Sequence, residues 1–132
     1  MSGYKTFSVD VPVRFSDLDA YGHVNNATFF TYLEHARIRI LRGAFNPSMS
    51  EGPVFLVKTA FCDYKRPIPM CESVAVTVNV LKVKRSSVEL GYTVSDGAEI
   101  IYAEATTVLV SFDPKASRPT AIPDWFLEMI KA

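Results

Sequence analysis

The sequence has 132 residues, enough for one domain of ordinary size built around a single hydrophobic core. Hydrophobic residues make up 48%, as in a globular protein, and 14 basic side chains balance 14 acidic ones, so the net charge attracts neither nucleic acid nor an anionic membrane. Any site for an anion must therefore be a local cluster of basic residues.

The beginning of the chain and its cysteines both indicate a cytoplasmic protein. Residues 1–15 mix charged with scattered apolar residues and lack the continuous apolar run of a signal peptide or a membrane span. Cys62 and Cys71 are too far apart for a C-x-x-C motif and have no second pair that would complete a zinc site. We therefore expect two free thiols in a reducing compartment.

The first half of the chain predicts a strand followed by a long helix. Residues 7–15 alternate between apolar and polar, as a strand does. The helix is predicted by apolar residues that recur at steps of four, three and four: Phe29, Leu33, Ala36 and Ile40. It should have about five turns and a length of about 25 to 30 Å, with an asparagine capping its start and Gly43 ending it. Its apolar stripe is broad, so we expect the helix to be largely wrapped.

From residue 54 onward the apolar period becomes two, which predicts an antiparallel meander. Strands are expected over residues 54–64 and 73–83, the second with valines at every other position on one face. Alternation from Val88 to Val94 leads into Asp96-Gly97, a tight-turn dipeptide, and the partner strand should run from Glu99 to Val110. A helix followed by a meander is an α+β layout, in which the sheet curls around the helix. A short amphipathic helix follows the proline-rich exit.

The stretch "FSDLDAYGHVNNATFF", residues 15–30, contains two acids, a glycine, a histidine and two asparagines before the long helix. It does not fit a calcium loop, because Tyr21 and Thr28 occupy the fifth and twelfth positions counted from Asp17. Asp19 and His23 alone are a poor set of ligands for a transition metal, so no metal is expected. A purely structural interpretation remains open, with the acids and Gly22 forming a turn that caps the helix.

The run "VRFSDLDAYGHVNNATFFTYLEHAR", together with the helix-then-meander order, resembles the acyl-CoA thioesterases of the hotdog fold, in particular the hydroxybenzoyl-CoA thioesterase-like branch. The similarity extends from Val11 to about Pro123, and its specific part is D-x-x-G-H-V-N-N, Asp19 to Asn26. The resemblance implies an α+β hotdog fold: a long central helix wrapped by a curved antiparallel sheet of about five strands. It also implies a homodimer, or a dimer of dimers, with active sites at the dimer interface and no cofactor.

The resemblance also assigns roles within the motif. It implies that Asp19 is the catalytic carboxylate and that the amide at or near Asn26 polarises the thioester carbonyl. Hydrolysis needs both a nucleophile or general base and an oxyanion donor, and the first turn of a helix offers unpaired N–H groups, here around Val24 to Asn26. Gly22 would let the backbone approach the acyl group. His23 and Asn26 would orient Asp19 or hold a water, or else serve in packing and capping.

Two departures from neighbouring branches matter. Some relatives have a tyrosine four residues before the aspartate and a histidine seven after it, whereas this chain has Phe15 and Asn26. A Tyr-Asp-His triad is therefore absent, and any histidine assistance would have to come from His23. Other hotdog thioesterases carry an acid on the helix, but Glu34 is three residues from Arg37, and an intrahelical ion pair explains it.

Coenzyme A carries several phosphates, and the densest basic cluster that could bind them lies where the 73–83 strand turns into the next strand: Lys82, Lys84, Arg85, Ser86 and Ser87. In resembling enzymes this turn and the exit of the last strand lie near the nucleotide, often of the other subunit, which adds Lys115 and Arg118. The expected function is hydrolysis of an acyl-CoA to free acid and CoA. The alternatives are an enzyme for acyl carrier protein thioesters or enoyl-CoA hydration, and a non-catalytic acyl-CoA-binding dimer.

Overall fold

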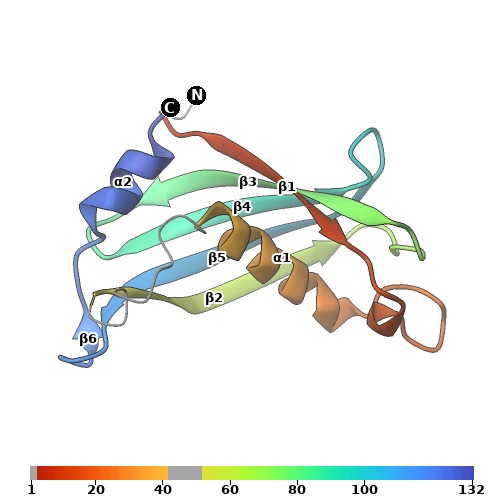
Figure 1. Cartoon of the computed structure of the whole chain (residues 1–132), viewed down its shortest axis with the longest axis horizontal. Helices are drawn as coiled ribbons and strands as arrows, with labels where there is room; N and C mark the ends of the chain where they lie inside the picture. The colour runs from red at the N-terminus through yellow and green to blue at the C-terminus, as the bar shows by residue number, and fades with distance from the viewer. Residues whose placement is uncertain (1–2, 42–51) are drawn as a thin grey trace.

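The fold is an antiparallel sheet with one long helix lying across a face, as Figure 1 shows. The computed structural model describes residues 3–41 and 52–132. The elements in chain order are β1 (Thr6–Pro12), the 3-10 turn η1 (Phe15–Asp17), α1 (Asn26–Ile40), β2 (Val54–Tyr64), β3 (Ser73–Val83), β4 (Ser87–Ser95), β5 (Ile101–Asp113), β6 (Arg118–Pro119) and α2 (Asp124–Ile130). No helix in these two ranges is long and apolar enough to cross a membrane.

The sheet has the strand order β1-β3-β4-β5-β2, with the short β6 added to β5. The predicted strands at residues 54–64 and 73–83 are confirmed with these bounds as β2 and β3. The β4–β5 hairpin is confirmed as well, with Gly97 at a positive φ of 85°. β5 begins at Ile101 rather than Glu99, because the Asp96 side chain accepts N–H bonds from Ala98 and Ile100 and holds the turn.

The first strand ends earlier than the alternation predicts. β1 stops at Pro12, and residues up to Phe15 are not in a strand. The cause is the Asp17 carboxylate, whose Oδ2 accepts the Arg14 backbone N–H at 2.9 Å and turns the chain into η1.

Helix α1 begins as predicted, because Asn25 caps it by accepting the Ala27 N–H at 2.9 Å. It has 15 residues, which corresponds to about four turns and ~22 Å rather than five turns. Ile40 is its last residue and Leu41 is the C-cap. Gly43, expected to end the helix, lies outside the described residues.

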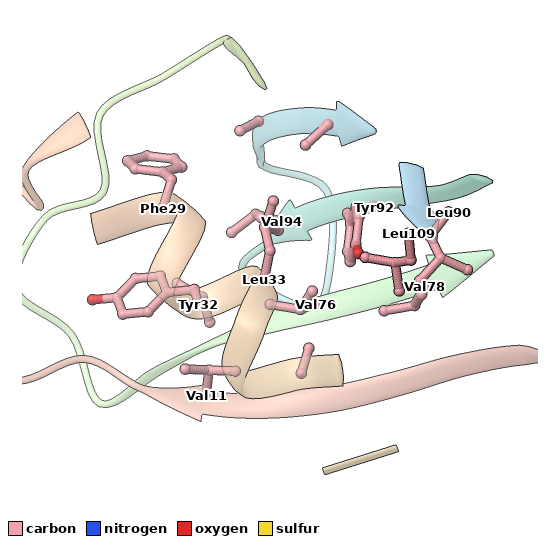
Figure 2. Packing of buried hydrophobic residues seen from close by; sticks show 14 of the residues in the cluster. Val11, Phe29, Tyr32, Leu33, Val76, Val78, Leu90, Tyr92, Val94 and Leu109 are labelled. Carbon is pink, nitrogen blue, oxygen red and sulfur yellow. The ribbon is translucent and has the colours of Figure 1, made fainter. Parts of the chain in front are cut away.

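The core lies between α1, α2 and the inner face of the sheet. Every second residue of β3 is buried there, namely Val74, Val76, Val78 and Val80. Figure 2 shows Leu33 pointing from α1 toward Val76 and Val94 of the sheet. The other side of α1 is open, and Ile38 is 51% exposed, so the prediction of a largely wrapped helix is only half right for a single chain.

Candidate active site

A cavity of about 370 Å³ lies between the 18–24 loop, the start of α1 and the segment that follows β2. It brings together three of the four motif residues predicted as catalytic: Asp19, His23 and Asn26. The rest of its lining consists of Tyr21, Val24, Phe29, Tyr64, Lys65, Arg66 and Pro67. Gly22 belongs to the same loop but does not line the cavity.

Backbone hydrogen bonds hold the loop in a tight turn. The Asp19 N–H donates to the His23 carbonyl at 2.9 Å, and the Gly22 N–H donates to the Asp19 carbonyl at 3.0 Å. Gly22 has a φ of 79°, which favours glycine, whereas a Cβ placed there would meet no described residue within 4 Å apart from its two chain neighbours. Within the chain itself, therefore, glycine is required by the backbone conformation rather than by close approach of a neighbour.

Asp17 and Asp19 have different surroundings. Asp17 is 5% exposed; its Oδ2 accepts the Tyr32 hydroxyl at 2.7 Å and the Arg14 N–H, and its Oδ1 accepts the Arg14 guanidinium. Burial alone would raise the pKa of Asp17, but the hydrogen bonds from Arg14 and Tyr32 outweigh it and lower that pKa. Burial, followed by the bond to this carboxylate, raises the pKa of the Tyr32 hydroxyl. Asp17 therefore stabilises the loop.

Asp19, by contrast, is exposed at the cavity wall. Its Oδ1 accepts the Tyr21 N–H at 2.9 Å, and no residue of the described ranges bonds to its Oδ2. A carboxylate held through one oxygen with the other facing solvent is oriented and still available to a ligand or a water.

At the start of α1, one backbone N–H has no partner within the described part of the chain. The N–H groups of Val24 and Asn25 donate to the carbonyls of Ile68 and Asp17, both at 2.9 Å. The two amides that follow Asn26 bond to Asn25, which caps the helix through its side chain and its carbonyl. Of the three amides predicted as oxyanion donors, only that of Asn26 has no acceptor among the described residues.

The opposite wall of the cavity, at the end of β2, was missed by sequence reasoning. The Tyr64 hydroxyl donates to the Asn26 carbonyl at 2.9 Å, and its ring packs edge-on against Phe29 with centroids 4.9 Å apart. Burial is the main cause that raises the pKa of Tyr64. Lys65 and Arg66 follow directly. No local signal in the sequence places the end of β2 beside the loop.

His23 is half-buried and lines the cavity, and its backbone forms a bridge with Pro69. No three His, Cys, Asp or Glu residues lie close enough to share a metal ion anywhere in residues 3–41 and 52–132.

The ion pair expected between Glu34 and Arg37 does not form. Arg37 instead turns toward the sheet, where its guanidinium donates to the buried Tyr92 hydroxyl at 3.2 Å. Glu34 is exposed in a separate groove on the open side of α1, away from Asp19.

The predicted phosphate-binding residues gather at the other end of the sheet. Lys84, Arg85 and Ser86 form the turn between β3 and β4, with Lys82 near the end of β3 and Ser87 at the start of β4. Lys115 lies in the β5–β6 connection and Arg118 begins β6. Figure 1 shows both connections at the end opposite the loop that carries Asp19. The Ile122 N–H donates to the Arg85 carbonyl, which ties the β3–β4 turn to the segment that follows β6. None of these residues lines the Asp19 cavity of the same chain.

Comparison with known proteins defines the class. An antiparallel sheet with a helix across one face matches solved thioesterases of the hotdog fold, as predicted. A thioesterase from Thermus thermophilus, solved in complex with coenzyme A and Zn, is 36% identical and has a TM-score of 0.78; the match covers 98% of this chain and 95% of that one.

Sequence comparison gives the same class. The acyl-CoA thioester hydrolase YbgC of Escherichia coli is 24% identical over 120 residues, which cover 89% of this chain and 90% of that protein. The protein YsmA of Bacillus subtilis is 34% identical over 87 residues, and the match spans 66% of this chain but only 59% of that protein. The model of the thioesterase-like superfamily matches residues 13–130. The chain therefore belongs to the thioesterase-like superfamily and is an enzyme of the thioesterase type, which confirms the resemblance drawn from the sequence.

Proposed function

We propose that this protein hydrolyses an acyl-CoA thioester to a free carboxylic acid and CoA at the Asp19 cavity. One observation carries the proposal: Asp19, with a carboxylate oxygen that has no partner in the described chain, lines the same cavity as Asn26, whose N–H also lacks an acceptor. A relative with coenzyme A bound and a relative named as an acyl-CoA thioester hydrolase support the substrate class.

Asp19 acts as nucleophile or general base in this proposal. As a nucleophile, its free oxygen attacks the thioester carbonyl, expels the CoA thiolate and leaves an anhydride that water cleaves. As a general base, it takes a proton from the attacking water. His23 lies in the same cavity and serves to hold the water or orient the carboxylate.

The Asn26 N–H is the oxyanion donor. It sits at the positive end of the α1 dipole and needs no side chain, so it stabilises negative charge that develops on the carbonyl oxygen. The Tyr64 hydroxyl, bonded to the carbonyl of the same residue, fixes the first turn of α1 against the end of β2. The donor is thus held in place from the opposite wall.

The active protein is a homodimer, or a dimer of dimers, paired along the β2 edges. β2 is the last strand of the sheet and presents exposed apolar side chains, with Leu56 at 47%, Val57 at 49% and Phe61 at 64%. An uncovered apolar edge of this length is an aggregation hazard in a monomer, and pairing across a twofold axis removes it.

The basic turn between β3 and β4, with Lys115 and Arg118, binds the phosphates of CoA. Because it lies far from Asp19 in its own chain, it would serve the active site of the partner subunit. Arginine and lysine suit phosphate oxygens through charge-assisted hydrogen bonds.

The test is turnover of a panel of acyl-CoA thioesters, aliphatic and aromatic, followed by thiol release. We expect Asp19-dependent release of CoA from at least one class of substrate. Binding of acyl-CoA without release of thiol from any member would refute hydrolysis.

A further inference from the structure

Two cations share the cavity with the proposed catalytic carboxylate. Lys65 and Arg66 line it together with Asp19, although the protein has no net charge to attract anions. Lys65 and Arg66 are not part of the cluster that the sequence predicts for phosphate binding. Hydrolysis of a neutral acyl group would not require a cation at their position either.

The segment that carries these cations is held rigidly. The backbone N–H groups of Lys65 and Arg66 both donate to the Tyr102 carbonyl, at 2.8 and 3.0 Å. Ile68 is fully buried and accepts the Val24 N–H at 2.9 Å, which joins the segment to the loop of Asp19. The two backbones that frame the cavity therefore keep a fixed distance from each other.

Arg66 is the cation that remains available. Lys65 pairs with Asp63 at 2.8 Å, both side chains being about half exposed, whereas no ion pair within the described ranges involves Arg66. Neither cation is paired with Asp19, so Arg66 is a cation without an ion-pair partner among the described residues in a cavity that Asp19 also lines. A guanidinium in this position matches a carboxylate by two parallel hydrogen bonds.

We propose that Arg66, assisted by Lys65, binds a second carboxylate on the acyl group, so that the preferred substrates are monothioesters of dicarboxylic acids. This inference rests on the proposed function, because it names the acyl class that the Asp19 site takes. The phosphates of CoA are the less suitable anion, because the long pantetheine arm holds them away from the thioester, whereas Arg66 and Asp19 line one cavity. The carboxylate of a short acyl chain, by contrast, stays within the same cavity.

N-acetylcysteamine thioesters test the proposal because they contain no phosphate. The substrates are adipyl and hexanoyl N-acetylcysteamine, with the methyl ester of the adipyl compound as a neutral match in length. Each is assayed with the parent protein and with Arg66→Gln, Lys65→Gln and Asp19→Asn, after subtraction of spontaneous hydrolysis. Lys5→Gln is the matched control, since it removes one exposed cation outside the cavity.

We expect the parent to have a higher kcat/KM for the adipyl than for the hexanoyl compound. Arg66→Gln should lower kcat/KM for the adipyl compound about tenfold and leave that for the hexanoyl compound and the methyl ester unchanged. Lys65→Gln should cause a smaller loss, because Lys65 is shared with Asp63, and Lys5→Gln none. Equal rates for the adipyl and hexanoyl compounds in the parent would overturn the proposal. So would hydrolysis of the adipyl compound by Arg66→Gln at the parent rate.

The proposed function fails separately from this inference. If Asp19→Asn hydrolysed the hexanoyl compound at the parent rate, the catalytic assignment would be wrong whatever the acyl preference. If Asp19→Asn were inactive and the adipyl compound had no advantage, hydrolysis at Asp19 would stand and only the carboxylate subsite would be lost.

Discussion

Asp17→Asn should destabilise the protein, because the Asp17 carboxylate accepts the hydrogen bonds that hold the loop before α1. It is 5% exposed and accepts hydrogen bonds from Tyr32 and from the backbone and side chain of Arg14. The guanidinium contributes little, since its side chain is 69% exposed. The other two bonds both go to Oδ2, that from Tyr32 buried and that from the Arg14 N–H partly buried. Asparagine offers them a neutral acceptor in place of a charged one, and this weakening costs about 2 to 3 kcal/mol, or about 6 to 12 °C in Tm.

Thermal unfolding at a fixed protein concentration measures this effect, with Asp19→Asn as the matched control. Asp19 is exposed and accepts one bond, so its variant should melt within about 0.5 kcal/mol of the parent. Tyr32→Phe removes the buried bond to Asp17, and in a double-mutant cycle it should be strongly coupled to Asp17→Asn. Equal stability of Asp17→Asn and Asp19→Asn would refute the different roles assigned to the two acids.

The same carboxylate gives a pH dependence of known sign. The folded-state pKa of Asp17 is lower than its ordinary value, so its contribution is full well above about pH 4 and is lost as the pH falls through the folded pKa. The stability difference between the parent and Asp17→Asn should therefore shrink in acid. A constant difference down to the acid transition would contradict this account.

Three further predictions concern the site and the assembly. Tyr64→Phe removes the hydroxyl that holds the Asn26 carbonyl and should lower kcat several-fold with little change in KM. Tyr92→Phe, away from the cavity, should affect stability rather than rate. Equal kinetics of the parent and Tyr64→Phe would contradict the positioning role. Light scattering at micromolar concentration should find a dimer or tetramer, and a strictly monomeric protein would rule out pairing along β2. Lys84→Ala combined with Arg85→Ala should raise KM for acyl-CoA far more than it lowers kcat, and an unchanged KM would move the phosphate site elsewhere.

The strands and the helix start could be predicted because their signals are local. The valines of β3 recur at every other position, and Asn25 supplies a cap whatever else the chain does. The end of β1 could not be predicted in this way, because it depends on the hydrogen bond from the Arg14 backbone N–H to the Asp17 carboxylate.

The cavity was predictable on one side only. The motif from Asp19 to Asn26 is contiguous, so its residues had to lie together. Tyr64, Lys65 and Arg66 reach it through backbone bonds between distant segments, such as that from Val24 to Ile68, and alternation along β2 gives no sign of this. The predicted ion pair between Glu34 and Arg37 was wrong for a similar reason. Glu34 is near Arg37 in the sequence, but Arg37 bonds to Tyr92, a residue of the sheet that is remote in sequence.

Thiol release from an acyl-CoA by Asp19→Asn, compared with Asp17→Asn, tests the central claim most directly. The substitution keeps the shape and the bond to the Tyr21 N–H but removes the charge, so kcat should fall by roughly 10² to 10⁴ while acyl-CoA affinity and Tm stay nearly unchanged. Asp17→Asn, corrected for its folded fraction, should lose far less activity. If folded Asp19→Asn hydrolysed acyl-CoA at the parent rate, Asp19 would not be catalytic and the loop would serve only to start helix α1.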